Sequence, residues 1–126
     1  DTMDTTFRSM YLGLSAFLDA NTERRELLLG QRPPRFDSSF DEAIALTGDD
    51  FERVALKAES ARDYFLLVGP PGTGKTSRAL RRMVEHFYAA SSMQILLLAY
   101  TNRAVDEICQ SLSSINLRYR LYTGGK

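Results

Sequence analysis

The chain has one cysteine and one histidine, and it lacks both a net charge and a long apolar run. A single cysteine, Cys109, excludes an intrachain disulfide and fits a cytoplasmic location; we expect it to be a small core residue. A single histidine, His86, gives little support to a metal cluster or a histidine-based triad, and we expect it to be exposed on a helix. No apolar run approaches the ~20 residues of a membrane span, and Asp1 and Asp4 replace the basic start of a signal peptide, so no membrane partner is expected.

The charge balance also limits what the chain can bind. Sixteen basic residues face sixteen acidic ones, so the total charge gives no signal for nucleic acid. Binding of a strand must then depend on a local patch, for which the candidates are Arg78, Arg81, Arg82 and Arg103. Arginines on a helix face are more often simply solvated, and Arg81 with Glu85 has the spacing of an ordinary i,i+4 ion pair.

What the chain does contain is the pattern G-x-x-x-x-G-K-[ST] at residues 69–76, read as Gly-Pro-Pro-Gly-Thr-Gly-Lys-Thr. The apolar run at 64–68 before it predicts a buried strand. The apolar residues after it recur at helical spacing and predict a helix. Strand, loop and helix in this order are what a phosphate-binding loop requires, and the remaining interpretation is a glycine-rich turn without a ligand.

Each residue type of this loop has a physical task. Glycines permit positive φ and a close backbone approach, so successive N–H groups can surround a phosphate, and a following helix N-terminus favours anions. Lys75 is expected to span the β- and γ-phosphates and Thr76 to ligate Mg²⁺; these two are the catalytic candidates. The expected ATP-binding residues of the loop are Gly69, Pro70, Pro71, Gly72, Thr73, Gly74, Lys75, Thr76 and Ser77.

A second informative stretch covers residues 94–112. An apolar strand from Gln94 ends at Thr101-Asn102-Arg103, and a helix follows with Thr101 or Asn102 as its N-cap. Its apolar residues, Ala104, Val105, Ile108, Cys109 and Leu112, fall on one face. Ligands of open α/β sheets gather at the carboxyl ends of the strands, so this turn is expected to share a rim with the phosphate loop.

Together these two stretches resemble motifs I and Ia of superfamily 1 helicases, and the form Asn-x-Ala-Val-Asp at 102–106 is most similar to the Upf1-like and Dna2-like branch. The resemblance covers about residues 51–115. It implies a RecA-like ATPase domain that binds ATP and Mg²⁺ and moves along a single nucleic-acid strand, with DNA expected. It also implies that Thr101, Asn102 and Arg103 contact the strand.

The sequence departs from that family at residue 52. Many superfamily 1 helicases carry a glutamine about seventeen residues before the first motif glycine, where it reads the adenine edge, and here Glu52 occupies that place. A carboxylate accepts from the adenine amino group but cannot donate to N7. Glu52 is therefore a base-contact candidate with altered selectivity, or an ordinary solvated helix residue.

Hydrolysis also needs an acidic residue at the end of another apolar strand, and none is found after Lys75. We therefore expect a piece of a larger ATPase whose remaining helicase domains are its partners. Two other functions stay open. One is a protein-remodelling AAA+ type ATPase, which shares the loop sequence, and the other is a nucleotide-gated binding module without hydrolysis.

The fold class predicted is α/β: a partial RecA-like P-loop core with parallel strands, preceded by a helical N-terminal segment. We predict a helical segment at 1–30, a linker at 31–50 and the partial core at 51–126. The helical segment holds an amphipathic helix through Leu18 and a shorter one from Thr22 that Gly30 ends; these either cover the sheet or meet another domain. A helix capped by Asp49 or Asp50 runs to about Ala61. Alternating residues at 117–122 predict a third strand.

Overall fold

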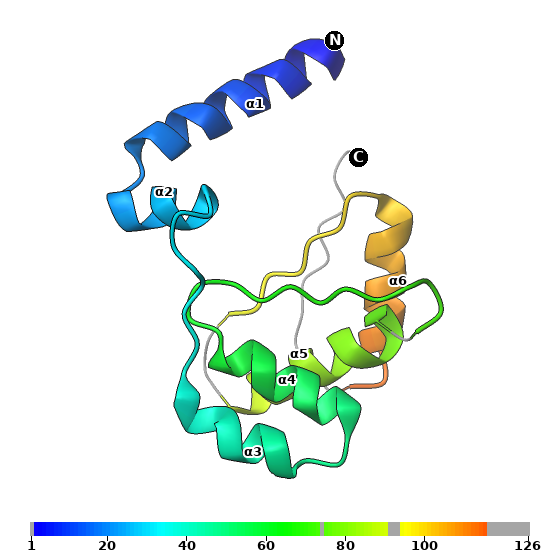
Figure 1. The fold of residues 1–126 in the computed structure, drawn as a ribbon. Helices are drawn as coiled ribbons and strands as arrows, with labels where there is room; N and C mark the ends of the chain where they lie inside the picture. The colour runs from blue at the N-terminus through cyan, green and yellow to red at the C-terminus, as the bar shows by residue number, and fades with distance from the viewer. Residues whose placement is uncertain (1, 74, 91–93, 116–126) are drawn as a thin grey trace. The chain divides into compact units, whose positions relative to one another are not determined.

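Figure 1 shows the fold, a computed structural model that describes residues 2–73, 75–90 and 94–115, with the backbone alone at 2 and 75–77. The chain divides into two compact units, Asp1–Arg35 and Phe36–Lys126. The boundaries predicted at 30 and 50 remain predictions. The third strand predicted at 117–122 lies outside the described residues.

The first unit is helical, as the apolar spacing predicted. Helix α1 spans Thr2–Asp19 and helix α2 spans Thr22–Leu28. At the start of α2 the Asn21 side chain accepts from the Arg24 amide over 2.9 Å. At its end Gly30 takes φ of 69°, while the amides of Gly30 and Gln31 donate to Leu27 and Glu26. This pair of bonds is a Schellman motif, which needs the left-handed residue that glycine supplies.

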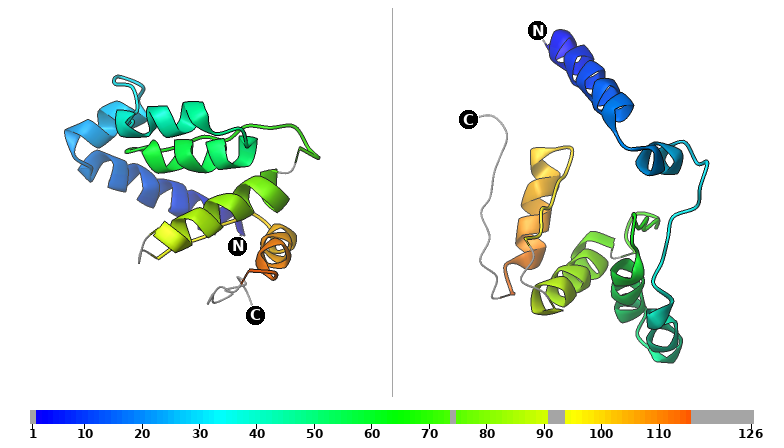
Figure 2. Two further views of the ribbon diagram at one scale, coloured as in Figure 1. Left: turned by 90° about the horizontal axis from the view of Figure 1, so that it is seen from below. Right: turned by 90° about the vertical axis from the view of Figure 1, so that its left-hand side faces the viewer.

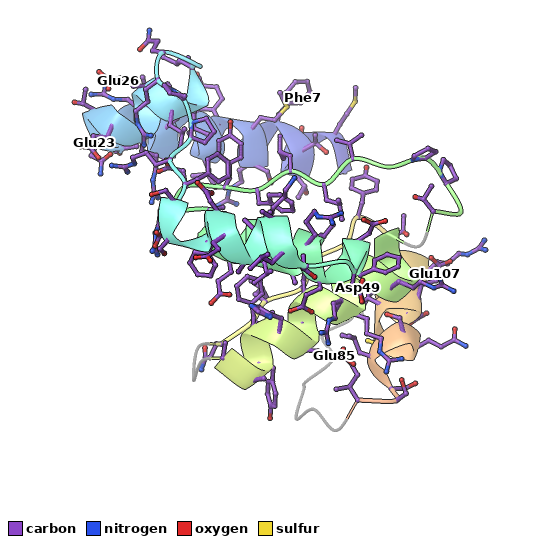
Figure 3. All side chains as sticks on the ribbon, turned by 60° about the horizontal axis from the view of Figure 1, so that its bottom comes forward. Phe7, Glu23, Glu26, Asp49, Glu85 and Glu107 are labelled. Atoms are coloured by element: carbon purple, nitrogen blue, oxygen red, sulfur yellow. The ribbon has the colours of Figure 1, made fainter. Side chains whose placement is uncertain are left out.

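Within residues 3–35 no residue is buried. Seven large apolar side chains of α1 are 57–80% exposed, and Phe17 is half-buried; the seven are Met3, Phe7, Met10, Tyr11, Leu12, Leu14 and Leu18. Figure 3 labels Phe7 among them. The apolar face that predicted this helix is thus present.

The second unit contains the helices that surround the phosphate loop. In chain order they are the 3₁₀ turn η1 (Ser38–Phe40), α3 (Asp41–Leu46), α4 (Asp50–Ser60), the π-helical η2 (Lys75–Leu80), α5 (Arg81–Ala90) and α6 (Asn102–Leu112). The capped helix at 50–60 and the helix after the loop are confirmed. The short helices η1 and α3 were not predicted, because the sequence pattern marked this stretch only as polar and proline-rich.

Side-chain caps explain where two of these helices begin. Asp49 Oδ1 accepts from the amides of Phe51 and Glu52 over 2.8 and 3.3 Å, which fixes the start of α4. Thr101 Oγ1 accepts from the Ala104 amide over 3.2 Å at the start of α6. Each cap satisfies amide groups that have no partner inside the helix. Both caps lie where the sequence predicted them.

A small core lies where these helices meet. Its four buried apolar residues come one each from α4, η2, α5 and α6: Ala55, Ala79, Val84 and Leu112. Helix α4 packs on α5 and η2, and α6 packs on η2. Figures 1 and 2 show the orange C-terminal half of α6 beside the light-green helix formed by η2 and α5. Alanine at two of the four positions lets these helices approach closely.

The predicted strands are not formed among residues 2–73, 75–90 and 94–115. Residues 64–70 and 94–99 run without regular hydrogen bonding, and Figure 1 draws them as long connecting segments. Exposure alternates along the first, with Leu66 and Val68 at 75% and 92%, so the side chains follow the period of a strand without being buried. A strand needs a neighbour for its backbone groups, and no described segment supplies one.

Extended backbone does pair at one described place. Phe36 and Ala61 form an isolated antiparallel bridge, and the Asp37 amide donates to the Ser60 carbonyl over 2.7 Å. The pKa of Asp37 is lowered, first by a hydrogen bond from the Ser39 side chain and then by bonds from the Ser39 amide and the Arg62 guanidinium. The bridge ties the beginning of the second unit to the end of α4.

None of the described helices combines the length and the apolar character that crossing a membrane needs.

Candidate functional site

The phosphate loop, residues 69–76, contains the bend that the sequence predicted. Pro71 and Gly72 form a turn in which Gly72 has φ of 81°, a left-handed value that glycine adopts without strain. Thr73 Oγ1 donates to the Pro70 carbonyl over 2.7 Å and closes the turn. Residues 70–73 are exposed, so their backbone is open to a ligand. Helix η2 then begins at Lys75, which directs the first amides of a helix toward the loop.

A hollow of about 280 Å³ lies beside this loop. It is lined from α4 by Asp50, Phe51 and Val54, from the segment before the loop by Leu67 and Val68, and from the loop and η2 by Gly69, Pro70, Thr73 and Ala79. Most of this lining is apolar. Because three loop residues also line the hollow, a ligand held by the loop can reach into it.

Two faces of α4 have different roles. Phe51 and Val54 lie on the face toward the hollow. Glu52 and Glu59, seven residues apart and so on one face of a helix, point to α5 instead. On α5, Arg82 and His86 are four residues apart and form the matching face. The α4–α5 interface is therefore charged outside its buried Ala55 and Val84.

The contacts of this charged layer, formed by Glu52, Glu59, Arg82, Glu85 and His86, are direct. Glu52 Oε2 accepts from Arg82 Nε over 2.7 Å and from Nη2 of the same guanidinium, which raises the pKa of Arg82. His86 Nε2 lies 2.5 Å from Glu59 Oε2, and its Nδ1 lies 4.0 Å from Glu52 Oε1. The His86 side chain is 19% exposed. The prediction of an exposed histidine was wrong, because Glu59 and Glu52 hold the ring between two helices.

The other predicted basic residues are also engaged. Arg81 Nε donates to Glu85 Oε1 over 3.1 Å, the i,i+4 pair expected from the sequence, and Glu85 is labelled in Figure 3. The Arg78 guanidinium carbon lies 5.9 Å from the centre of the Phe51 ring, within cation–π range. Arg81 and Arg82 share Glu85, so both arginines already have an acidic partner within the chain.

The segment that resembles motif Ia ends in an exposed turn. Thr101, Asn102 and Arg103 are all exposed, and Arg103 Nε donates to Glu107 Oε1 over 3.3 Å while its side chain stays 90% accessible. The apolar face of α6 points inward as predicted, with Leu112 buried and Cys109 half-buried. The three candidate residues are therefore accessible to a large ligand.

The structure brings Gly69, Pro70 and Thr73 together with α4 around one hollow. The nucleotide contact predicted for Glu52 remains a prediction. Gly74 and the side chains of Lys75, Thr76 and Ser77 lie outside the described part, so their roles also stay predictions. Within that part, no group of three acidic, histidine or cysteine side chains could hold a metal ion. Phe51 and Val54 were missed, although their i,i+3 spacing on a capped helix just before the loop was a usable signal.

The chain is similar to a family of ATPase domains and to several helicases. The family model described as an AAA domain matches residues 52–120. A DNA replication ATP-dependent helicase/nuclease, JHS1 of Arabidopsis thaliana, is 33% identical over 94% of this chain and 10% of its own length. The human protein of the same description, DNA2, is 30% identical over 75% of this chain and 10% of its own. An ATP-dependent helicase of Methanocaldococcus jannaschii is 28% identical over 86% of this chain and 17% of its own.

The chain thus spans about a tenth of the length of the first curated relatives it matches. No solved structure matches it.

Proposed function

The chain belongs to the AAA domain family, among the Upf1/Dna2-like superfamily 1 helicases, and we propose that it is the ATP-binding portion of an ATP-dependent DNA helicase. In this proposal ATP hydrolysis is coupled to movement along a single strand. The relatives JHS1 and DNA2 are named as DNA replication helicases, which favours DNA over RNA. A protein-remodelling ATPase is not favoured.

The turn at Pro71–Gly72 carries the proposal. It presents an exposed, left-handed glycine bend directly before the first amides of η2, which is the geometry in which backbone N–H groups converge on a phosphate. Lys75 then spans the phosphates, while Thr76 is the proposed Mg²⁺ ligand and Gly74 and Ser77 complete the loop. The nearby hollow gives the rest of the nucleotide a surface.

The proposal also covers the parallel sheet and the location of the protein in the cell. We propose that segments 64–68 and 94–99 are strands of a RecA-like sheet in the longer protein, since their side chains follow the strand period and their apolar groups are exposed here. A cytoplasmic location remains our prediction from the single cysteine.

The test of the nucleotide site is Lys75→Ala in the full-length protein. Losing a charge-assisted contact to phosphate should weaken binding of a fluorescent ATP analogue at least about tenfold. Lys57→Ala removes an equal charge from an exposed position on α4 and should leave the affinity unchanged. Circular dichroism should be the same for both variants. Unchanged ATP affinity in Lys75→Ala would contradict the phosphate loop.

The strand contact is tested separately by photo-cross-linking to a single-stranded DNA. We propose that Thr101, Asn102 and Arg103 contact its backbone, because they form an exposed helix start. Label should appear at these residues, and binding should weaken as salt rises because phosphate contacts release counterions. Absence of label at any salt concentration would instead favour the protein-remodelling ATPase.

A further inference from the structure

The hollow beside the phosphate loop has few groups that could read the edge of a base. Its side chains from α4 and from the segment before the loop include Phe51, Val54 and Leu67. The ionisable residue among its lining residues is Asp50, whose Oδ1 lies 2.5 Å from Arg53 Nη1. The Thr73 hydroxyl donates to the Pro70 carbonyl. A ligand in this hollow therefore meets mainly apolar surface.

Glu52, the residue that follows Phe51 in α4, points away from this surface. It does not line the hollow, and its Oε2 accepts two bonds from the Arg82 guanidinium on α5. Phe51 lines the hollow, whereas Glu52, about 100° further round α4, bonds to α5 instead. These two charge-assisted bonds to one carboxylate oxygen hold Glu52 on the α5 side.

We infer that the base of the bound nucleotide is held by its flat face against Phe51 and not by bonds to its edge, so that ATP and GTP bind with similar affinity. This inference rests on the proposed nucleotide-binding function. It makes Glu52 a residue that joins α4 to α5, and Phe51 the residue that contacts the base.

The physical reason is that purines share their ring faces and differ at their edges. Stacking on an aromatic ring depends on the π-face and tolerates any base. Discrimination between adenine and guanine needs donors and acceptors fixed opposite the ring edge, and leaving such groups unpaired is what rejects the wrong base. The hollow offers a ring and aliphatic groups instead. Arg78, 5.9 Å from the Phe51 ring centre, can stack as well.

The volume of the hollow fits the base of a nucleotide whose phosphates lie outside the hollow. A volume of about 280 Å³ is slightly below the 300–1,000 Å³ of pockets for whole ligands. Gly69, Pro70 and Thr73 border both the hollow and the loop bend. One nucleotide can thus place its base in the hollow and its phosphates on the loop.

The experiment is competition against ribose-labelled fluorescent ATP on the full-length protein, with ATP, GTP and inorganic tripolyphosphate as competitors. The inhibition constants of ATP and GTP should differ by less than about tenfold, since leaving an edge group unpaired at a discriminating site typically costs about tenfold or more. A preference for ATP or for GTP above that limit would overturn the inference. If tripolyphosphate still competes, the proposed function survives such a result; if no competitor acts and labelled ATP does not bind, the proposed function itself fails.

Two substitutions sharpen the result. Phe51→Ala should weaken ATP and GTP alike by about tenfold and leave tripolyphosphate unaffected, with Tyr88→Ala, an exposed ring on α5, as the matched control without effect. Glu52→Gln should leave the ratio of ATP to GTP affinity within about threefold of the original. An unchanged nucleotide affinity in Phe51→Ala, or a larger change of ratio in Glu52→Gln, would each show that the base is read elsewhere.

Discussion

Two regions of the second unit contain similar apolar residues, but one region buries them and the other leaves them exposed. The helices α4, η2, α5 and α6 bury Ala55, Ala79, Val84 and Leu112 to within 5% exposure. The segments 64–68 and 94–99 leave Leu66, Val68, Leu96 and Leu98 at 75–92% exposure. A helix completes its backbone bonds within itself and needs a neighbour on one side only. A strand of a parallel sheet needs neighbours for its backbone and for both faces of the sheet.

The difference shows which interactions the second unit can form by itself. The helices of this unit pack on other helices within a few dozen residues, whereas the extended segments would have to pair with strands that the described residues do not contain. The phosphate loop joins the two regions, since it follows residues 64–68 and continues into η2, which begins at Lys75. Its bend is nevertheless formed, because the turn depends on local bonds and on Gly72.

The largest effect is expected from Leu112→Ala, measured by urea unfolding of the 126-residue chain. Leu112 is 4% exposed, and truncating a buried leucine costs about 2–5 kcal/mol. The matched variant Leu98→Ala truncates the same side chain at 79% exposure and should change the free energy of unfolding by less than about 0.5 kcal/mol.

The full-length protein provides the opposite expectation for Leu98. If segment 94–99 is a strand there, as we propose, the loss for Leu98→Ala should rise toward that for Leu112→Ala. Equal losses already in the 126-residue chain would show that the extended segment is packed without further strands, which would break the comparison.

A smaller effect is expected where extended backbone does pair. Asp37 beside the Phe36–Ala61 bridge has a pKa below its ordinary value of 3.8 through bonds from Ser39 and Arg62. A lowered carboxyl pKa stabilises the folded state above that value, and the contribution disappears as the pH falls through the folded pKa. Asp37→Asn should therefore be less stable at pH 7, and its difference from the unsubstituted chain should shrink below pH 3.8.

Asp106→Asn is the matched control for this measurement, since it alters one exposed carboxylate on α6. It should lower the stability at pH 7 less than Asp37→Asn does. A difference between Asp37→Asn and the unsubstituted chain that stays constant from pH 7 to pH 3 would contradict the role of the Asp37 charge.

The sequence was sufficient for features that depend on neighbouring residues. The caps at Asp49 and Thr101, the end of α2 at Gly30 and the bend at Gly72 each rest on bonds within a few positions. Residue type and spacing determine such bonds, so the sequence could place them.

Features that depend on residues far apart in the chain could not be predicted as well from the sequence. His86 was expected at the surface because nothing in its own helix marks Glu59, 27 residues earlier, as its partner. The orientation of Glu52 toward Arg82, 30 residues away, is likewise set by how α4 packs on α5. The hollow combines three separate segments and could not be read from any one of them.

The bridge between Phe36 and Ala61 has a consequence for the order of folding. It brings together the two ends of a stretch that includes α3 and α4, and the Arg62–Asp37 pair closes the same loop across 25 residues. Contacts of such short range cost little chain entropy and form early. We expect this stretch to acquire its structure while the ribosome is still adding the residues behind it, so that the phosphate loop emerges next to a surface already made.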